Sequence, residues 1–251
     1  MPARVSEAII LRSYPLQEAD LVVSFFTRDQ GKLRGVAKRA RRPKSPFGAG
    51  LERLSLVKMA YFQRESRELV NLDSCELIHS SFLLQADYTS SVALDFMAEI
   101  SERFLPDAEV NEKFFRLLMA MLEAMRGGPA GVWRTVTYFS YWTVRLAGVL
   151  PALHVCSGCG AWLDDPENPQ RAFFTRHDAG IYCVNCCRSN GWELSAASRK
   201  LAEEMSRKPE GQLEERGWTK ETAADLRHFL VQRMEETIER KLVTAAVLEA
   251  L

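Results

Sequence analysis

The chain has 251 residues and a mass of 28.5 kDa, which exceeds the usual size of one domain and predicts two compact units, or three. Hydrophobic residues make up 47% and charged residues 26% of the sequence, a composition that argues against intrinsic disorder. No stretch approaches the roughly 18 apolar residues that cross a bilayer, and the N-terminus lacks the features of a signal peptide. We therefore expect a soluble, cytoplasmic protein with no membrane partner.

The formal net charge is zero, but the charges are unevenly distributed along the chain. Residues 1–80 contain 14 lysines and arginines against 9 acidic residues, whereas the remainder contains 19 against 24. Eight basic residues and one acidic residue fall between Arg28 and Lys44. The neutral total by itself argues against a nucleic-acid partner, but a basic N-terminal unit joined to an acidic C-terminal one points to a polyanion.

Short strands are predicted over the first eighty residues. Segments rich in β-branched and aromatic residues cover 8–12, 21–27, 32–39, 51–62 and 69–78. Asp29-Gln30-Gly31 predicts a turn, because glycine accepts a positive φ, and the prolines and glycines of 41–50 predict a loop. Five short strands in about 75 residues favour a small closed or partly open barrel over a sandwich, which needs about seven strands.

After His79 the hydrophobic residues recur at three and four positions, which predicts helices. The predicted helices cover 82–105, 112–126, 132–150, a segment beginning at 195, and 220–251. A cysteine-containing segment interrupts them. We therefore expect an α+β multidomain protein with a β-barrel domain over 1–80 and an α-helical domain over 81–251, into which a metal-binding knuckle is inserted at about 152–190.

The strongest local signal is a pair of Cys-x-x-Cys motifs separated by 23 residues, formed by Cys156, Cys159, Cys183 and Cys186. Thiolates at this spacing lie on tight turns, and four of them match the tetrahedral coordination that Zn²⁺ prefers at about 2.3 Å. Because protein ligands would fill all four positions, the zinc would be structural and would contribute folding free energy.

Several alternatives to this zinc site stay open. The four thiols could be paired by coincidence, could act in redox chemistry or could hold an iron–sulfur cluster. Cys187 could replace Cys186, and His154 or His177 could replace one cysteine. The remaining cysteine, Cys75, is expected to be a small core residue.

The second signal is the basic stretch, which continues from a predicted strand into the proline-bounded loop. Its candidate phosphate contacts are Lys32, Arg34, Lys38, Arg39, Arg41, Arg42 and Lys44. Basic residues on a small barrel can follow a nucleic-acid backbone, and nearby aromatic rings can stack on bases. The candidate rings are Phe25, Phe26, Tyr61 and Phe62, although alternation predicts that one of each adjacent pair points into the core. The alternative is a solvated cationic loop.

No motif indicates an enzyme. The sequence lacks the phosphate-binding G-x-x-x-x-G-K-[ST] loop and the dinucleotide-binding G-x-G-x-x-G turn. It also lacks the H-E-x-x-H and G-x-S-x-G motifs of hydrolases. Two rival classes are a protein-interaction scaffold with no direct DNA role, in which the basic loop is incidental, and an enzyme with a catalytic metal.

Several short segments, taken together and in this order, resemble the bacterial RecO family of DNA repair proteins along essentially the full chain. The matching segments are Ala8-Ile-Ile-Leu-Arg-Ser13, Glu18-Ala-Asp20, Phe26-Thr-Arg28, Gly31-Lys-Leu-Arg-Gly-Val-Ala-Lys38, Arg41-Arg-Pro-Lys-Ser45, Leu146-Ala-Gly-Val-Leu-Pro151, Cys156-Ser-Gly-Cys-Gly160, Phe173-Phe174, Gly180-Ile-Tyr-Cys183 and Cys186.

The resemblance implies an N-terminal OB-fold, a helical C-terminal domain and a zinc knuckle. It also implies a role in recombinational repair. Members of the family bind single- and double-stranded DNA, anneal complementary strands and, with the partner RecR, help RecA replace single-strand-binding protein. They also bind the C-terminal tail of single-strand-binding protein on the helical domain, but no compact motif assigns that contact to residues of this chain.

Overall fold

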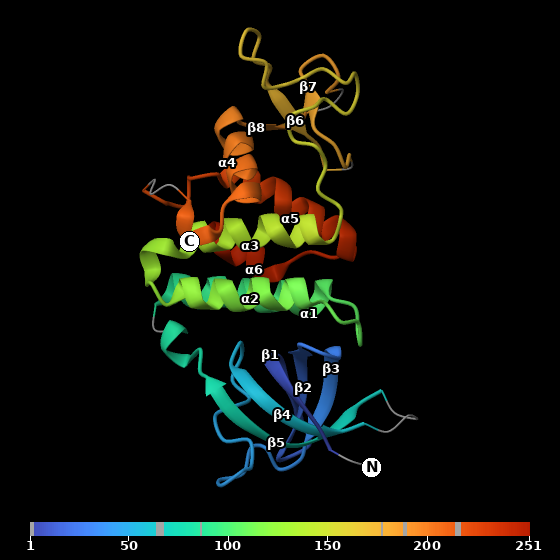
Figure 1. Ribbon diagram of the computed structural model, residues 1–251, viewed down its shortest axis with the longest axis vertical. Coiled ribbons are helices and arrows are strands. Elements are labelled where there is room, and N and C mark those ends of the chain that lie inside the picture. The colour runs from blue at the N-terminus through green and yellow to red at the C-terminus, as the bar shows by residue number, and fades with distance from the viewer. Residues whose placement is uncertain (1–2, 64–67, 86, 177, 188–189, 214–216) are drawn as a thin grey trace.

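The computed structural model describes residues 3–63, 68–85, 87–176, 178–187, 190–213 and 217–251. A β-barrel, two layers of helices and a small sheet are stacked along the long axis of the molecule (Figure 1). The strands of the barrel are β1 (Arg4–Leu16), β2 (Asp20–Thr27), β3 (Gly31–Ala37), β4 (Leu56–Phe62) and β5 (Val70–His79). The helices are η1 (Phe82–Gln85), α1 (Tyr88–Phe104), α2 (Glu112–Met125), η2 (Pro129–Gly131), α3 (Val132–Leu146), α4 (Ala196–Arg207), η3 (Glu210–Gln212), α5 (Ala224–Ile238) and α6 (Val243–Ala250).

The barrel closes in the strand order β1-β2-β3-β5-β4, with a parallel pairing between β3 and β5 and antiparallel pairings elsewhere. This five-stranded barrel followed by helices confirms the predicted fold class and corresponds to an OB-fold. The β2–β3 turn requires Gly31, whose φ is +74°. A Cβ atom at Gly31 would also lie 2.2 Å from the carbonyl oxygen of Glu109, so the segment before α2 can approach the turn only because this residue is glycine.

The barrel and the helices share one continuous hydrophobic core. Outward-facing Ile9, Leu11 and Phe26 belong to the same buried cluster as the helices, while the inward-facing residues form a separate cluster inside the barrel. The ring of Phe26 lies 6.1 Å from Phe114 and 5.6 Å from Phe115. The two domains therefore pack through an apolar patch on the outer face of the barrel.

Side-chain caps place the helix ends. The carboxylate of Asp87 accepts the N–H of Ser90 at 2.8 Å, so the predicted 82–105 helix is divided into η1 and α1. Asn111 caps α2 in the same way. The predicted 220–251 helix is wrong as a single element, because Glu239 takes the left-handed conformation and ends α5. The chain then turns, and the carboxylate of Glu99 accepts the first N–H groups of α6.

The cysteine segment forms its own small sheet between α3 and α4. This sheet has the order β7-β6-β8 and comprises β6 (Ala172–Phe174), β7 (Tyr182–Cys183) and β8 (Trp192–Leu194). It lies at the opposite end of the molecule from the barrel (Figure 1). The ring of Phe174 packs edge-on against Phe229 of α5 at 5.2 Å, which joins the knuckle to the helical core. No helix in the described part of the chain is long and apolar enough to span a membrane.

Candidate metal centre and nucleic-acid interface

The four cysteines of the two Cys-x-x-Cys motifs meet in the folded knuckle. The Sγ atoms of Cys156, Cys159, Cys183 and Cys186 all lie within 4.8 Å of one another, and those of Cys159 and Cys183 are 3.9 Å apart. Two thiolates on one tetrahedral zinc ion, each at about 2.3 Å from it, are about 3.8 Å apart. The cluster therefore has the dimensions of a four-thiolate site and could hold a metal ion.

The local backbone explains why the cysteines converge. The N–H of Gly160 donates to the carbonyl of Cys156 at 2.9 Å, which closes a tight turn around the first motif, and Gly160 has a φ of +73°. The N–H of Ser157 donates to Ile181 at 2.8 Å and ties this turn to the second motif. At Gly158 a Cβ atom would lie 2.9 Å from the Cβ of Cys186, so the absence of a side chain here lets the two motifs approach each other closely.

One thiol of the cluster, that of Cys156, has a lowered pKa. Burial raises the pKa of Cys156, but hydrogen bonds from the backbone N–H groups of Cys183, Cys159 and Gly158 outweigh it and lower that pKa to about 6. The N–H of Cys183 lies 3.3 Å from the Cys156 sulfur. Since the thiolate is the form that binds a metal, these donors favour the ligand state of Cys156 at neutral pH.

The structure decides between most of the alternative ligands. The cluster includes Cys186, whereas Cys187 is outside it. His154 also lies outside it, with its ring against Trp162 at a centroid distance of 4.5 Å. His177 lies outside the described residues. Cys75 is half-buried beside the barrel core, as expected, and its thiol donates to the carbonyl of Phe47 at 3.2 Å.

Six of the seven predicted phosphate contacts are exposed: Arg34, Lys38, Arg39, Arg41, Arg42 and Lys44. The last five lie on the segment that follows β3, which we call the basic loop (residues 38–44). Their side chains make no ion pair or hydrogen bond with any described residue, whereas Arg34 lies 3.6 Å from the carboxylate of Glu102. The basic loop therefore offers five basic side chains that have no ion-pair partner among the described residues.

The prediction for Lys32 is wrong. Its side chain is only 5% exposed, and Nζ donates to the main-chain oxygen of Glu102 at 2.6 Å and pairs with Asp107 at 3.1 Å. Lys32 does share the outward face of β3 with Arg34, as the alternation predicts. That end of β3 is covered by the helical domain, so Lys32 cannot meet a phosphate.

The backbone of the basic loop is fixed although its side chains are free. The N–H of Arg39 donates to the carboxylate of Asp20 at 2.7 Å, and the N–H of Arg41 donates to the carbonyl of Ala19 at 3.0 Å. Both acceptors belong to the β1–β2 connection or the first residue of β2. The loop thus holds its charges beside this connection before any ligand binds, which lowers the entropic cost of binding.

One residue of each adjacent aromatic pair points into the core, as predicted, but a third aromatic residue is covered by the helical domain. Phe25 and Tyr61 are fully buried inside the barrel, where their rings are 5.9 Å apart. Phe26 points outward as alternation requires, but α2 covers it. Only Phe62 is partly exposed. The β2–β3 face through which OB barrels commonly bind oligonucleotides is therefore partly occupied by the protein's own helices.

Sequence reasoning missed a group of arginines at the junction of the barrel and the helices. Arg12, Arg53 and Arg103 line one cleft, although they come from β1, from the residues before β4 and from α1. No local spacing connects positions so far apart in the chain. The only local signal was Arg12, a charge that directly follows the apolar run from Ala8 to Leu11 in β1.

The sequence comparisons agree with this architecture. Residues 1–81 match the family model "Recombination protein O N terminal", and residues 85–245 match "Recombination protein O C terminal". A protein from Koribacter versatilis named DNA repair protein RecO is 44% identical over 246 residues, which cover 98% of each chain. The protein of that name from Cutibacterium acnes is 30% identical over 191 residues, 74% of this chain and 75% of the relative. The one from Anaeromyxobacter sp. (strain K) is 29% identical over 194 residues, 77% and 74% of the two chains. The chain therefore belongs to the RecO family of DNA repair proteins.

Proposed function

We propose that this protein is a recombination mediator that binds single- and double-stranded DNA, anneals complementary single strands and, with RecR, helps to load RecA onto DNA coated by single-strand-binding protein. The observation that carries the proposal is the basic loop, which presents five cations that pair with no described residue, on a barrel of the RecO family. The partners RecR and the tail of single-strand-binding protein come from the family resemblance. Such a role would be carried out in the cytoplasm, on bacterial DNA.

Electrostatics supplies the proposed mechanism. Annealing requires that the repulsion between two phosphate backbones be screened while the bases remain free to pair. Lysine and arginine side chains do this when they replace condensed counterions, and phosphate contacts carry no sequence preference. We assign these contacts to Arg34, Lys38, Arg39, Arg41, Arg42 and Lys44. No step needs a catalytic residue, so we propose that the protein acts without being an enzyme.

We also propose that the four cysteines hold a structural zinc ion. The thiolates would fill every tetrahedral position, which leaves none for a reacting water molecule and disfavours a catalytic metal. The ion would supply cross-linking that the knuckle needs, because the strands in the described part of 152–190 are only two and three residues long. Its loss would disturb the sheet that packs on α5.

The test of the proposed function is the annealing of two complementary oligonucleotides without ATP, with and without single-strand-binding protein, across a salt series. We expect acceleration that declines as salt rises and that is lost in the triple variant Arg39→Ala, Arg41→Ala, Arg42→Ala. The matched control replaces three exposed basic residues of the helical domain, Lys113, Arg116 and Lys200, by alanine. Folded, metal-loaded protein that accelerates annealing at no salt concentration would contradict the proposal and favour a protein-interaction scaffold.

A further inference from the structure

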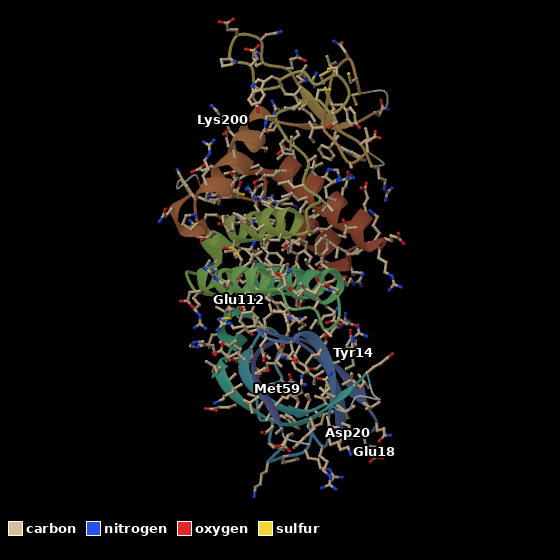
Figure 2. The ribbon with its side chains drawn as sticks, turned by 45° about the vertical axis from the view of Figure 1, so that its right-hand side comes forward. Tyr14, Glu18, Asp20, Met59, Glu112 and Lys200 are labelled. Atoms are coloured by element: carbon tan, nitrogen blue, oxygen red, sulfur yellow. The ribbon has the colours of Figure 1, made fainter. Side chains whose placement is uncertain are left out.

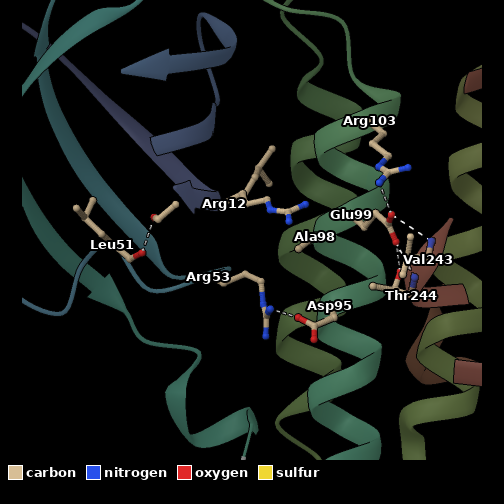
Figure 3. A pocket seen from close by; sticks show the side chains of 11 residues that line it. Arg12, Leu51, Arg53, Asp95, Ala98, Glu99, Arg103, Val243 and Thr244 are labelled. Carbon is tan, nitrogen blue, oxygen red and sulfur yellow. Dashed lines mark hydrogen bonds and ion pairs between the residues drawn. The ribbon is translucent and has the colours of Figure 1, made fainter. Parts of the chain in front are cut away.

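A cleft of about 520 Å³ separates the barrel from α1 and α6 (Figure 3). Its charged lining consists of Arg12, Arg53, Arg103, Asp95 and Glu99. Its volume is within the range of small-molecule binding sites. Neither the cysteine cluster nor the basic loop includes any of these residues.

A β-bulge points Arg12 toward this cleft. The register of β1 against β2 shifts just before Arg12, and Leu11 is the additional residue. Arg12 consequently pairs with Ser24, whose hydroxyl faces α1 and donates to the carboxylate of Glu102. Without the bulge, strict alternation would turn Arg12 into the barrel core. The bulge therefore places a charge at the domain junction.

The other charges of the cleft already have partners. Arg53 pairs with Asp95 across the junction, and Arg103 pairs with Glu99 at 2.9 Å (Figure 3). Glu99 also accepts two N–H groups at the start of α6. Arg12 forms no ion pair or hydrogen bond with any residue in the described ranges. The cleft thus has an excess of one positive charge, and that charge is exposed.

The excess positive charge acts on the neighbouring Arg53. Burial lowers the pKa of the Arg53 guanidinium, and the positive charge of Arg12 lowers it further. The Nε–H of Arg53 has no acceptor among the described residues. An anion between the two guanidinium groups would reduce their repulsion and could accept hydrogen bonds from Arg12, which has no other partner among the described residues.

The surroundings of Arg12 indicate which anion suits the cleft. Its guanidinium lies 5.0 Å from the ring centroid of Tyr14, which is 39% exposed. On the other side of Ser24, Arg34 occupies the paired position on β3. Arg12 and Arg34 thus lie two strands apart on one face, about 10 Å from each other at the backbone. Spaced cations beside an accessible aromatic ring are typical of single-strand binding surfaces.

We propose that the cleft between the barrel and α1 binds a phosphate group of single-stranded DNA through Arg12, with the neighbouring base stacked on Tyr14. This inference rests on the proposed function and deepens it, because it adds a contact beyond the basic loop. The strand would pass from Arg34 to Arg12 along the edge of α1, because Ser24 between them is buried beneath Glu102. An acidic peptide is the rival occupant, but a cation beside an exposed ring matches the alternating phosphates and bases of a single strand.

The test measures the affinity of the full-length, metal-loaded protein for a fluorescent oligothymidylate of about 16 nucleotides, near the upper limit for one OB-fold. Arg12→Gln is compared with Lys200→Gln, which removes the same charge from α4, far from Tyr14 (Figure 2). We expect Arg12→Gln to weaken binding by about five- to ten-fold and to reduce the slope of log K against log salt by about 0.7, whereas Lys200→Gln changes neither. Tyr14→Ala should weaken binding by about five-fold or more without changing that slope, while Tyr14→Phe retains the affinity.

Three outcomes separate the two proposals. If Arg12→Gln binds the oligonucleotide as tightly as Lys200→Gln while the triple loop variant does not, the cleft proposal is overturned and the proposed function stands. If Arg12→Gln loses affinity only for an aspartate-rich peptide, the cleft binds acidic peptides instead. If the wild-type protein itself shows no salt-dependent DNA binding, both proposals fail.

Discussion

Lys32 of the barrel and Glu102 of α1 join the two domains, because the Nζ of Lys32 donates to the main-chain oxygen of Glu102 at 2.6 Å. The side chain of Glu102 is itself buried and accepts the hydroxyl of Ser24 from β2. A single helical turn of α1 thus receives contacts from two neighbouring strands. This contact explains why a lysine within a basic stretch is buried at the domain interface.

We predict that Lys32→Met lowers the free energy of unfolding by about 1–3 kcal/mol, because it leaves a buried carbonyl without its donor. The lost ion pair with Asp107 adds little, since Asp107 is 64% exposed. DNA affinity of the folded variant should be unchanged. Urea denaturation and DNA titration of Lys32→Met and Lys38→Ala check this. Lys38→Ala should keep the free energy of unfolding and lose DNA affinity. Equal loss of DNA affinity in both variants would restore Lys32 as a phosphate contact.

Metal analysis should find one zinc ion per chain. We expect Cys159→Ser, which removes the exposed member of the cluster, to lose the metal and to lower Tm by at least about 5 °C. The loss of stability should extend from the knuckle to the helical core, because Phe174 packs on Phe229 of α5. Cys187→Ser is the control and should retain the ion. Iron in place of zinc, or full metal content in Cys159→Ser, would contradict the assignment.

Gly158→Ala should weaken metal binding without removing a ligand. The added methyl group would lie 2.9 Å from the Cβ of Cys186 and 3.1 Å from its sulfur, so the two motifs would have to move apart. We expect an affinity loss of about ten-fold or more, measured by competition with a chromogenic chelator. Gly211→Ala, where no atom lies within 4 Å of the new Cβ, provides the matched control. An unchanged affinity in Gly158→Ala would show that the knuckle opens more easily than this packing indicates.

Stability should decrease in mild acid through His228. Burial lowers the pKa of this histidine, while the carboxylate of Glu249 partly opposes the shift. The unfolded chain therefore binds the proton more readily, and this contribution to stability is lost as the pH falls below about 6.5. His228→Gln should reduce the difference in unfolding free energy between pH 7.5 and pH 5.5. If wild type and variant lose the same stability over this interval, His228 is not responsible.

Much of the architecture follows from local pattern. Short segments rich in β-branched and aromatic residues predict five strands, and the three- and four-residue period predicts the helical part. One boundary that fails is at Glu239, where no glycine or proline marks the end of α5. The break is stabilised from elsewhere, since Glu99 of α1 accepts the first N–H groups of α6. A single sequence does not reveal a cap supplied from about 140 residues away.

The sequence by itself determined the cysteine cluster and the basic loop, because in both the chemistry lies in residues that are close together or repeat at a fixed spacing. Only the tertiary structure decided which outward-facing residues of the barrel remain exposed. Lys32 and Arg34 are equivalent by alternation, yet the helical domain covers one and leaves the other half-exposed. The arginines of the cleft meet only when the barrel docks on α1. Alternation specifies the face of a strand, whereas burial of that face depends on contacts between distant segments.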